Sequence, residues 1–148
     1  MKPYELKPIG WVRKMDDQPA VEIDPQYAPA LDGLAGFSHV WVIYWFHEHD
    51  DPQSRSVLKV HPRKNPANPL TGVFGTRSPR RPNLIGLSAA RIIAIENNIL
   101  KLDKLDAREG TPIVDLKPYL PEIDLHPEAT TPEWVSRRNP SPRETPTW

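Results

Sequence analysis

Residues 39–47 read His-Val-Trp-Val-Ile-Tyr-Trp-Phe-His, a nearly continuous run of aromatic and β-branched residues. In a strand, side chains alternate between two faces, so Trp41, Ile43 and Trp45 would share one face and residues 40, 42, 44 and 46 the other. A strand that is apolar on both faces has to be covered on both. This stretch therefore predicts a buried strand of a small barrel whose outer face is covered by a helix, a loop or a second subunit.

The rest of the chain has a short-strand pattern. Nineteen prolines in 148 residues, against a usual ~5%, exclude long helices and favour short strands joined by rigid turns. Further extended runs are expected at 6–13, 56–61, 70–76, 85–96, 98–103 and 112–117, with a short helix at 27–35 that ends near Asp32-Gly33. Because strands and helices do not alternate, we expect a mainly all-β fold: a small antiparallel β-barrel with minor helix, formed by residues 1–125.

Composition sets limits on partners and location. Nineteen Lys and Arg balance nineteen Asp and Glu, so any affinity for RNA must come from local patches. The absence of cysteine excludes disulfides, thiolate zinc sites and cysteine nucleophiles. The N-terminus lacks the apolar core of a signal peptide, and no apolar run is long enough to span a bilayer. We therefore expect a soluble, cytoplasmic protein without membrane association.

Residues 126–148 are expected to form a Pro-rich C-terminal arm rather than a separate domain. Apart from Val135, the large apolar residues in this segment are Trp134 and Trp148, and so little apolar surface cannot offset the entropy of ordering it. The arm would be ordered only if a tryptophan docks on the barrel or on a partner subunit. Arginines make it mildly basic, which is compatible with a solvated tail or with an RNA contact: Arg137, Arg138 and Arg143.

An arginine loop stands between two apolar strand-like runs. Residues 71–88 read Thr-Gly-Val-Phe-Gly-Thr-Arg-Ser-Pro-Arg-Arg-Pro-Asn-Leu-Ile-Gly-Leu-Ser. The prolines keep the backbone extended, so Arg77, Arg80 and Arg81 would present guanidinium groups at fixed spacing. Such groups suit phosphate or carboxylate recognition; the alternative is a solvated basic turn.

Four ordered blocks, at residues 36–47, 61–65, 72–88 and 105–119, resemble the TsaA-like family, also called TrmO-like. The resemblance spans roughly residues 6–125. It implies a β-barrel that binds S-adenosylmethionine, commonly forms a homodimer and methylates N6 of threonylcarbamoyladenosine next to the tRNA anticodon. The partners it implies are therefore tRNA and a second copy of the chain.

The resemblance also implies roles for individual residues. Cofactor contacts carry over to His47, Arg77, Leu87 and the turn Glu109-Gly110-Thr111-Pro112, where the family usually has Asp in place of Glu109. Apart from the resemblance, Arg80 and Arg81 lie farther out in the arginine loop, where solvent-facing guanidinium groups can reach an RNA phosphate. The expected substrate contacts are Arg80, Arg81, Lys117 and Tyr119. The family often has an aromatic or apolar residue at position 80 and usually has proline at position 84, where this chain has Leu84. These departures leave the identity of the substrate open.

Methyl transfer to a urea-like nitrogen needs a group that removes or shares its proton. The catalytic candidates are Asp106, Asp115 and Asn83, with His47 also available. If Asp115 points inward, burial would raise its pKa and suit it to act as a base; if it points outward, it would pair with Lys117 or an arginine. Asn83 either hydrogen-bonds the threonylcarbamoyl group or braces its own turn.

Other chemistries are disfavoured. His39 and His47 would lie ~26 Å apart along a strand, so they cannot share an ion, and a His47/His49 pair lacks further ligands; we expect no metal site. No Gly-x-Gly-x-x-Gly occurs, which argues against a Rossmann-type methyltransferase. Two alternatives to the tRNA methyltransferase remain: a methyltransferase of the same fold with a small-molecule substrate, and a non-catalytic module that binds S-adenosylmethionine or RNA.

Overall fold

The computed structural model describes residues 1–136, which form two compact units. The barrel unit contains residues 1–48 and 85–119, and the loop unit contains residues 49–84 and the segment that begins at residue 120. The expected domain boundary after residue 125 stays a prediction. Part of the expected arm, with Arg137, Arg138, Arg143 and Trp148, lies outside the described residues.

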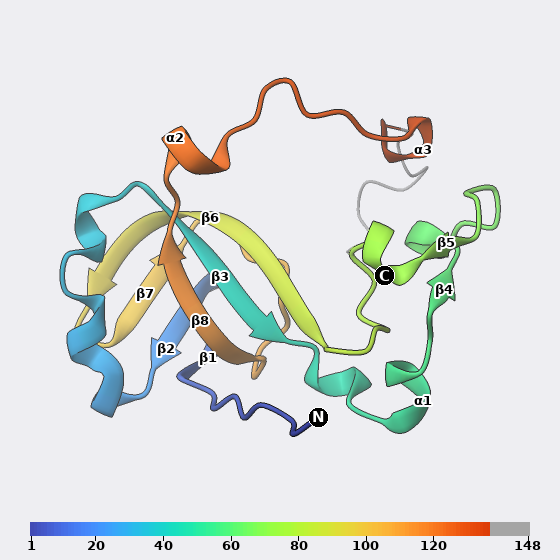
Figure 1. Cartoon of the computed structure of the whole chain (residues 1–148). Coiled ribbons are helices and arrows are strands. Elements are labelled where there is room, and N and C mark those ends of the chain that lie inside the picture. The colour runs from blue at the N-terminus through green and yellow to red at the C-terminus, as the bar shows by residue number, and fades with distance from the viewer. Residues whose placement is uncertain (137–148) are drawn as a thin grey trace. The chain divides into compact units, whose positions relative to one another are not determined.

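Six antiparallel strands close into a barrel in the order β1-β2-β7-β6-β3-β8 (Figure 1). The strands are β1 (Gly10–Met15), β2 (Gln18–Ile23), β3 (His39–Trp45), β6 (Ile85–Glu96), β7 (Ile99–Leu102) and β8 (Pro112–Pro118). The predicted mainly β fold with an antiparallel barrel and minor helix is confirmed. Closure is uneven, because β3 pairs with β6 at seven positions whereas β1 pairs with β8 at two, Gly10–Ile113 and Trp11–Pro112.

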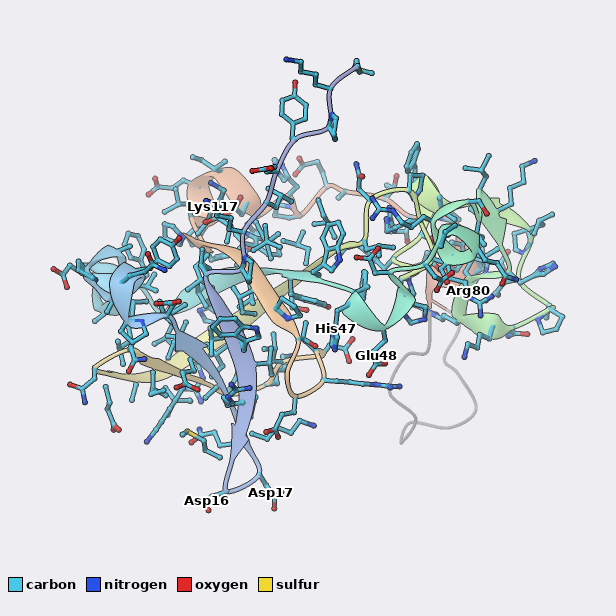
Figure 2. All side chains as sticks on the ribbon, turned by 90° about the horizontal axis from the view of Figure 1, so that it is seen from below. Asp16, Asp17, His47, Glu48, Arg80 and Lys117 are labelled. Atoms are coloured by element: carbon cyan, nitrogen blue, oxygen red, sulfur yellow. The ribbon has the colours of Figure 1, made fainter. Side chains whose placement is uncertain are left out.

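The strand β2 is absent from the runs expected from sequence. It follows β1 through a two-residue turn, Asp16-Asp17, in which both residues have positive φ (50° and 62°), and Figure 2 shows both at the tip of the hairpin. Such turns usually carry Asn or Gly, and Pro19 argues against a strand. Pro19 is tolerated because it pairs only with Lys14, while the pairing of β2 with β7 begins at Ala20.

The barrel core contains the inward row of β3. Val40, Val42 and Tyr44 are buried, whereas the outward row of Trp41, Ile43 and Trp45 is half-buried. The predicted alternation is therefore correct, but the strand ends at Trp45. Residues His47–His49 form a 3-10 helix instead of continuing the strand.

Two 3-10 helices, Pro25–Leu31 and Leu34–Gly36, occupy the stretch where one short helix was expected. Gly33 separates them in a left-handed conformation (φ 89°), which glycine adopts without steric cost. Leu31 anchors this segment in the barrel core.

The loop unit has little regular structure. The expected strands at 56–61 and 70–76 shrink to a two-residue pair, β4 (Lys59–Val60) and β5 (Thr71–Gly72), followed by the 3-10 helix Val73–Gly75. A further 3-10 helix covers Pro62–Lys64, and the α-helical turns are α1 (Pro52–Arg55), α2 (Pro121–Asp124) and α3 (Glu133–Ser136). None of the helices within residues 1–136 has the length and apolar character required to cross a membrane.

Candidate functional site

Three strands bring predicted cofactor residues to one end of the barrel. The end of β3 pairs with the start of β6 (Trp45 with Ile85) and with the start of β8 (Tyr44 with Ile113). His47 lies two residues beyond β3, Leu87 is the third residue of β6, and the turn 109–112 leads into β8. The barrel unit therefore gathers His47, Leu87 and this turn at what we call the β3 end of the barrel.

An ion pair holds the loops at the β3 end together. Arg108 Nη1 lies 2.7 Å from Glu48 Oε2, which connects the residue after His47 to the residue before Glu109. Both side chains are solvent-exposed. Sequence reasoning missed this pair, because the two residues are 60 positions apart and neither carries a motif signal.

Aromatic packing explains the glycine in β6. A Cβ atom on Gly86 would overlap the ring of Tyr44 and lie 2.9 Å from Cζ of Phe46. These two rings pack edge to face, with centroids 5.5 Å apart. The close approach holds β6 against the end of β3. It thereby fixes the position of Leu87, the next residue of β6, along the barrel axis.

The turn 109–112 offers a carboxylate rather than free amides. Gly110 is left-handed (φ 82°), its N–H donates to the Val12 carbonyl at 2.8 Å, and the Thr111 N–H donates to the Arg108 carbonyl at 3.1 Å. Thr111 is buried and Glu109 is exposed. Both amides are therefore engaged within the protein, and the cofactor contacts of this turn stay a prediction. The exposed Glu109 carboxylate suits a cationic group.

The loop before this turn contains Asp106, whose carboxyl remains in contact with solvent. Desolvation by the surrounding protein nevertheless raises its pKa. Its neighbours Leu105 and Ala107 pack on the core, which explains how a surface carboxyl is partly desolvated. A carboxyl with a raised pKa holds and releases a proton closer to neutral pH than an ordinary one.

The side chain of Asp115 points outward from the barrel, not inward. It pairs across β3 with Ile43, on the outer face, lies 3.4 Å from the ammonium of Lys117 and accepts a hydrogen bond from the Leu116 N–H at 2.9 Å. Its carboxylate is thus engaged by one cation and one amide. This contact is the salt bridge that was one of the two expected fates of Asp115.

The structure does not bring Lys117 and Tyr119 to the β3 end. Lys117 pairs with Trp41 near the start of β3, and the Tyr119 ring packs on Trp41 and His39, with centroids 5.4 and 6.1 Å away. The Tyr119 N–H also donates to the His39 carbonyl at 3.0 Å. Both residues therefore lie toward the opposite end of β8 from the turn 109–112, and their role as substrate contacts stays a prediction.

The arginine loop belongs to the loop unit and differs from expectation at Arg81. Arg81 Nη1 donates to the carbonyls of Thr76 and Ser78, both at 3.1 Å, and burial together with the charge of Arg77 lowers the pKa of Arg81. The expectation that Arg81 presents a solvent-facing fork is wrong, because the side chain folds back to satisfy carbonyls of its own loop. Arg77, Arg80 and Asn83 are exposed.

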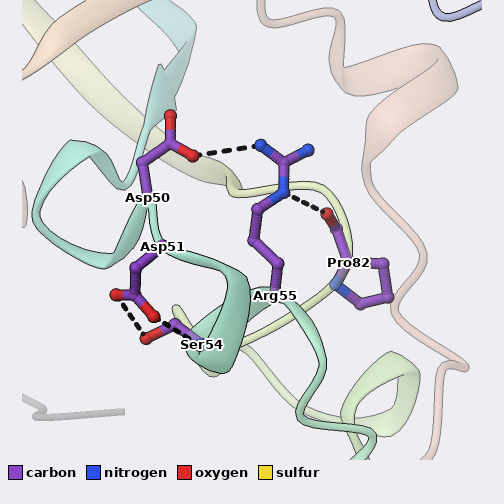
Figure 3. A network of polar contacts seen from close by, with 5 residues as sticks. All are labelled: Asp50, Asp51, Ser54, Arg55 and Pro82. Atoms are coloured by element: carbon purple, nitrogen blue, oxygen red, sulfur yellow. Dashed lines mark hydrogen bonds and ion pairs between the residues drawn. The ribbon is translucent and has the colours of Figure 1, made fainter.

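A polar network joins α1 to the end of the arginine loop (Figure 3). Arg55 Nε donates to the Pro82 carbonyl at 3.2 Å, and its Nη1 lies 3.1 Å from Asp50 Oδ1. Asp51 caps α1 by accepting from the Ser54 N–H at 2.7 Å and from its hydroxyl at 3.0 Å. The helix α1 therefore supports the loop that carries Arg77 and Arg80.

Residues 1–136 contain a further cavity and no metal-binding cluster among the groups described. No cluster of three or more His, Cys, Asp or Glu side chains is arranged to hold a metal ion there. A cavity of about 330 Å³ lies beside the second half of β8 and is lined mainly by apolar side chains, with Asp32 and Asp115 its charged members. It includes none of the predicted cofactor residues.

Comparison with known proteins identifies related chains. Residues 8–125 match the model of the tRNA-methyltransferase O N-terminal domain. The chain is 43% identical over 121 residues to a "Probable S-adenosyl-L-methionine-binding protein" of Methanocaldococcus jannaschii, covering 82% of this chain and 96% of the relative. It is also 43% identical over 95 residues to the human tRNA (adenine(37)-N6)-methyltransferase, covering 64% of this chain and 21% of the human protein.

A crystal structure of TrmO has the same fold. It superposes with a TM-score of 0.70 at 31% identity, over 88% of this chain and 64% of the TrmO chain. With the match over residues 8–125, these likenesses establish that the chain belongs to the family of the tRNA-methyltransferase O N-terminal domain.

Proposed function

We propose that this chain is an S-adenosylmethionine-dependent methyltransferase that acts on N6 of threonylcarbamoyladenosine next to the tRNA anticodon. The observation that carries the proposal is the convergence of His47, Leu87 and the turn 109–112 at the β3 end. Relatives named for binding S-adenosylmethionine and for tRNA adenine N6 methylation support the cofactor and the substrate.

The side chains at the β3 end fit the chemistry of the cofactor. S-adenosylmethionine carries a sulfonium, an ammonium and an apolar adenine face, and when bound it supplies an electrophilic methyl group. Glu109 offers an exposed carboxylate to the cations, while Leu87 offers exposed apolar surface to the ring. Arg77 belongs to the loop unit, and its contact with the cofactor stays a prediction from its motif.

Asp106 is the best supported proton acceptor in the barrel unit. It lies in the same loop as Glu109, and desolvation raises its pKa above that of an ordinary carboxyl, which makes it a stronger proton acceptor. Asp115 is engaged by Lys117 and the Leu116 amide, which leaves it poorly placed for that role. Asn83 remains a candidate contact for the threonylcarbamoyl group.

We further propose that the protein is a cytoplasmic homodimer. Three directly paired positions of β3 and β6 form an outward apolar row: Trp41–Ala89, Ile43–Leu87 and Trp45–Ile85. Ile85, at the end of this row, is 41% exposed, and an exposed apolar side chain beside further apolar residues is typical of an interface. A cytoplasmic location follows from the proposed tRNA substrate.

The proposal is tested by incubating the purified protein with S-adenosylmethionine and tRNA that contains unmethylated threonylcarbamoyladenosine, followed by mass spectrometry of the nucleosides. We expect the methylated nucleoside, and we expect Asp106→Asn to lower its rate of formation while Asp17→Asn, at the hairpin tip, does not. Calorimetric binding of S-adenosylmethionine without any methylated nucleoside would favour a binding module or a small-molecule methyltransferase instead.

A further inference from the structure

The cavity beside the second half of β8 contains none of the predicted cofactor residues and has a chemistry of its own. Its volume of about 330 Å³ falls within the ~300–1,000 Å³ of small-molecule sites. The lining residues come from Ile9 and Ile23, from the 3-10 segment 27–37 and from positions 115–118 of β8, and all of them belong to the barrel unit. We call it the β8 cavity.

Apolar and aromatic side chains form most of the wall of the β8 cavity. Leu31 is buried in the barrel core, and Leu116 and Tyr27 pack against that core. Phe37 is 39% exposed, so its ring remains accessible at the cavity. Apolar walls favour an apolar ligand body, and the faces of aromatic rings attract cations.

Two carboxylates line the cavity, and one of them lacks a basic partner. Asp115 lies 3.4 Å from the ammonium of Lys117. In the described part of the chain, no Lys or Arg forms an ion pair with Asp32. Asp32 is exposed and stands between the two 3-10 helices, where the left-handed Gly33 turns the backbone. The β8 cavity therefore has one carboxylate that no protein cation balances.

We propose that the β8 cavity binds an organic ammonium ion, namely a small monocation with an apolar or aromatic body. The ammonium group pairs with Asp32, and the body lies against the apolar wall and the rings of Tyr27 and Phe37. One unbalanced carboxylate matches one positive charge. This inference goes beyond the proposed function, because it adds a second ligand site and depends on neither S-adenosylmethionine nor tRNA.

S-adenosylmethionine is itself an organic cation, so the two sites have to be separated. His47, Leu87 and the turn 109–112 do not line the β8 cavity. The turn leads into the first residue of β8, whereas the cavity begins at Asp115, in the second half of that strand. A ligand of the β8 cavity should therefore bind together with S-adenosylmethionine and not compete with it.

The first test compares three probes of similar shape with the full chain: 2-phenylethylammonium, the neutral 2-phenylethanol and the anionic 3-phenylpropionate. At neutral pH, matched ionic strength and millimolar probe, 2-phenylethylammonium should raise the thermal midpoint saturably, because a ligand that binds only the folded state stabilises it. The alcohol should raise it less, and the anion should not raise it. An ammonium ion that raises the midpoint no more than the alcohol does would overturn the inference.

The second test locates the site with variants. Asp32→Asn should weaken binding of 2-phenylethylammonium roughly two- to tenfold, as expected for one partly solvated ion pair, and should leave binding of 2-phenylethanol unchanged. The matched control Asp16→Asn, which removes an exposed carboxylate at the hairpin tip, should bind both probes like the parent. Ala30→Phe places a ring at the exposed rim of the cavity and should weaken binding of both probes.

Three results would overturn the inference and leave the proposed function standing. Asp32→Asn could bind the ammonium ion like the parent, which would place the probe elsewhere. S-adenosylmethionine could displace the probe, which would make the cavity part of the cofactor site. Asp32→Asn or Ala30→Phe could lower the mass measured by light scattering, which would make the cavity a contact between two copies of the chain.

Discussion

At Gly86, the absence of a side chain allows the Tyr44 and Phe46 rings to pack against the backbone of β6. Gly86→Ala should destabilise the protein by about 1–3 kcal/mol, because overpacking a filled site forces rings or backbone to shift. Chemical denaturation measures the loss. Gly36→Ala is the matched control, since nothing lies within 4 Å of the added methyl group; equal stability of the two variants would contradict the packing argument.

Asp106 gives a pH-dependent prediction. Because its pKa is raised in the folded protein, the folded state binds this proton more tightly than the unfolded chain, and stability falls as pH rises through the raised pKa. Asp106→Asn removes that effect, so the variant should have the higher urea midpoint at pH 7. The difference should vanish below about pH 4, where both states are protonated. An unchanged difference at pH 3 and pH 7 would argue against desolvation of this carboxyl.

At the scale of elements, α1 depends on its cap. Hydrogen bonds from the backbone and hydroxyl of Ser54 lower the pKa of Asp51. This carboxylate therefore stabilises the fold at pH values above the ordinary carboxyl pKa, and the stabilisation is lost as the pH falls through the lowered pKa. Asp51→Ala should therefore reduce the thermal midpoint at pH 7 and have a smaller effect near pH 2. Asp50→Ala removes the ion pair to Arg55 but leaves the cap in place. It should therefore lower the thermal midpoint less than Asp51→Ala does.

Elements with strong periodic signals were predictable, and those that depend on special backbone angles were not. The strand over 85–96 was predicted at the bounds that β6 has, because apolar residues, among them Ile92, Ile93 and Ile95, fill most of that run. The strand β2 was missed because an Asp-Asp turn with two positive φ angles has no glycine to mark it. The strands expected in the loop unit are short because Pro62 directly follows the first of them and a 3-10 turn, Val73–Gly75, occupies the second half of the other.

The candidate site was predictable only in part, because motifs give residue types but not pairings. The convergence of His47, Leu87 and the turn 109–112 follows from register between strands far apart in sequence. The inward folding of Arg81 depends on carbonyls of its own loop.

At the scale of the whole molecule, we expect a dimer with twice the 16.9 kDa mass of the chain. Ile85→Glu places a charge in the outward apolar row of β3 and β6 and should shift light scattering toward the monomer. Ile93→Glu is a matched control, with the same 41% exposure on the same strand outside that row. A parent that scatters as a monomer across the micromolar range would contradict the proposed interface.

The uneven closure of the barrel determines where the molecule opens first. Two residue pairs join β1 to β8, and one of them includes Pro112, which has no amide hydrogen to donate. Local openings start where the fewest hydrogen bonds must break. In deuterium-exchange mass spectrometry, the amides of Ile9 and Val12, which donate across this junction to Ile113 and Thr111, should therefore label well before those of β3. We therefore expect β1 to separate from β8 before the rest of the barrel wall opens.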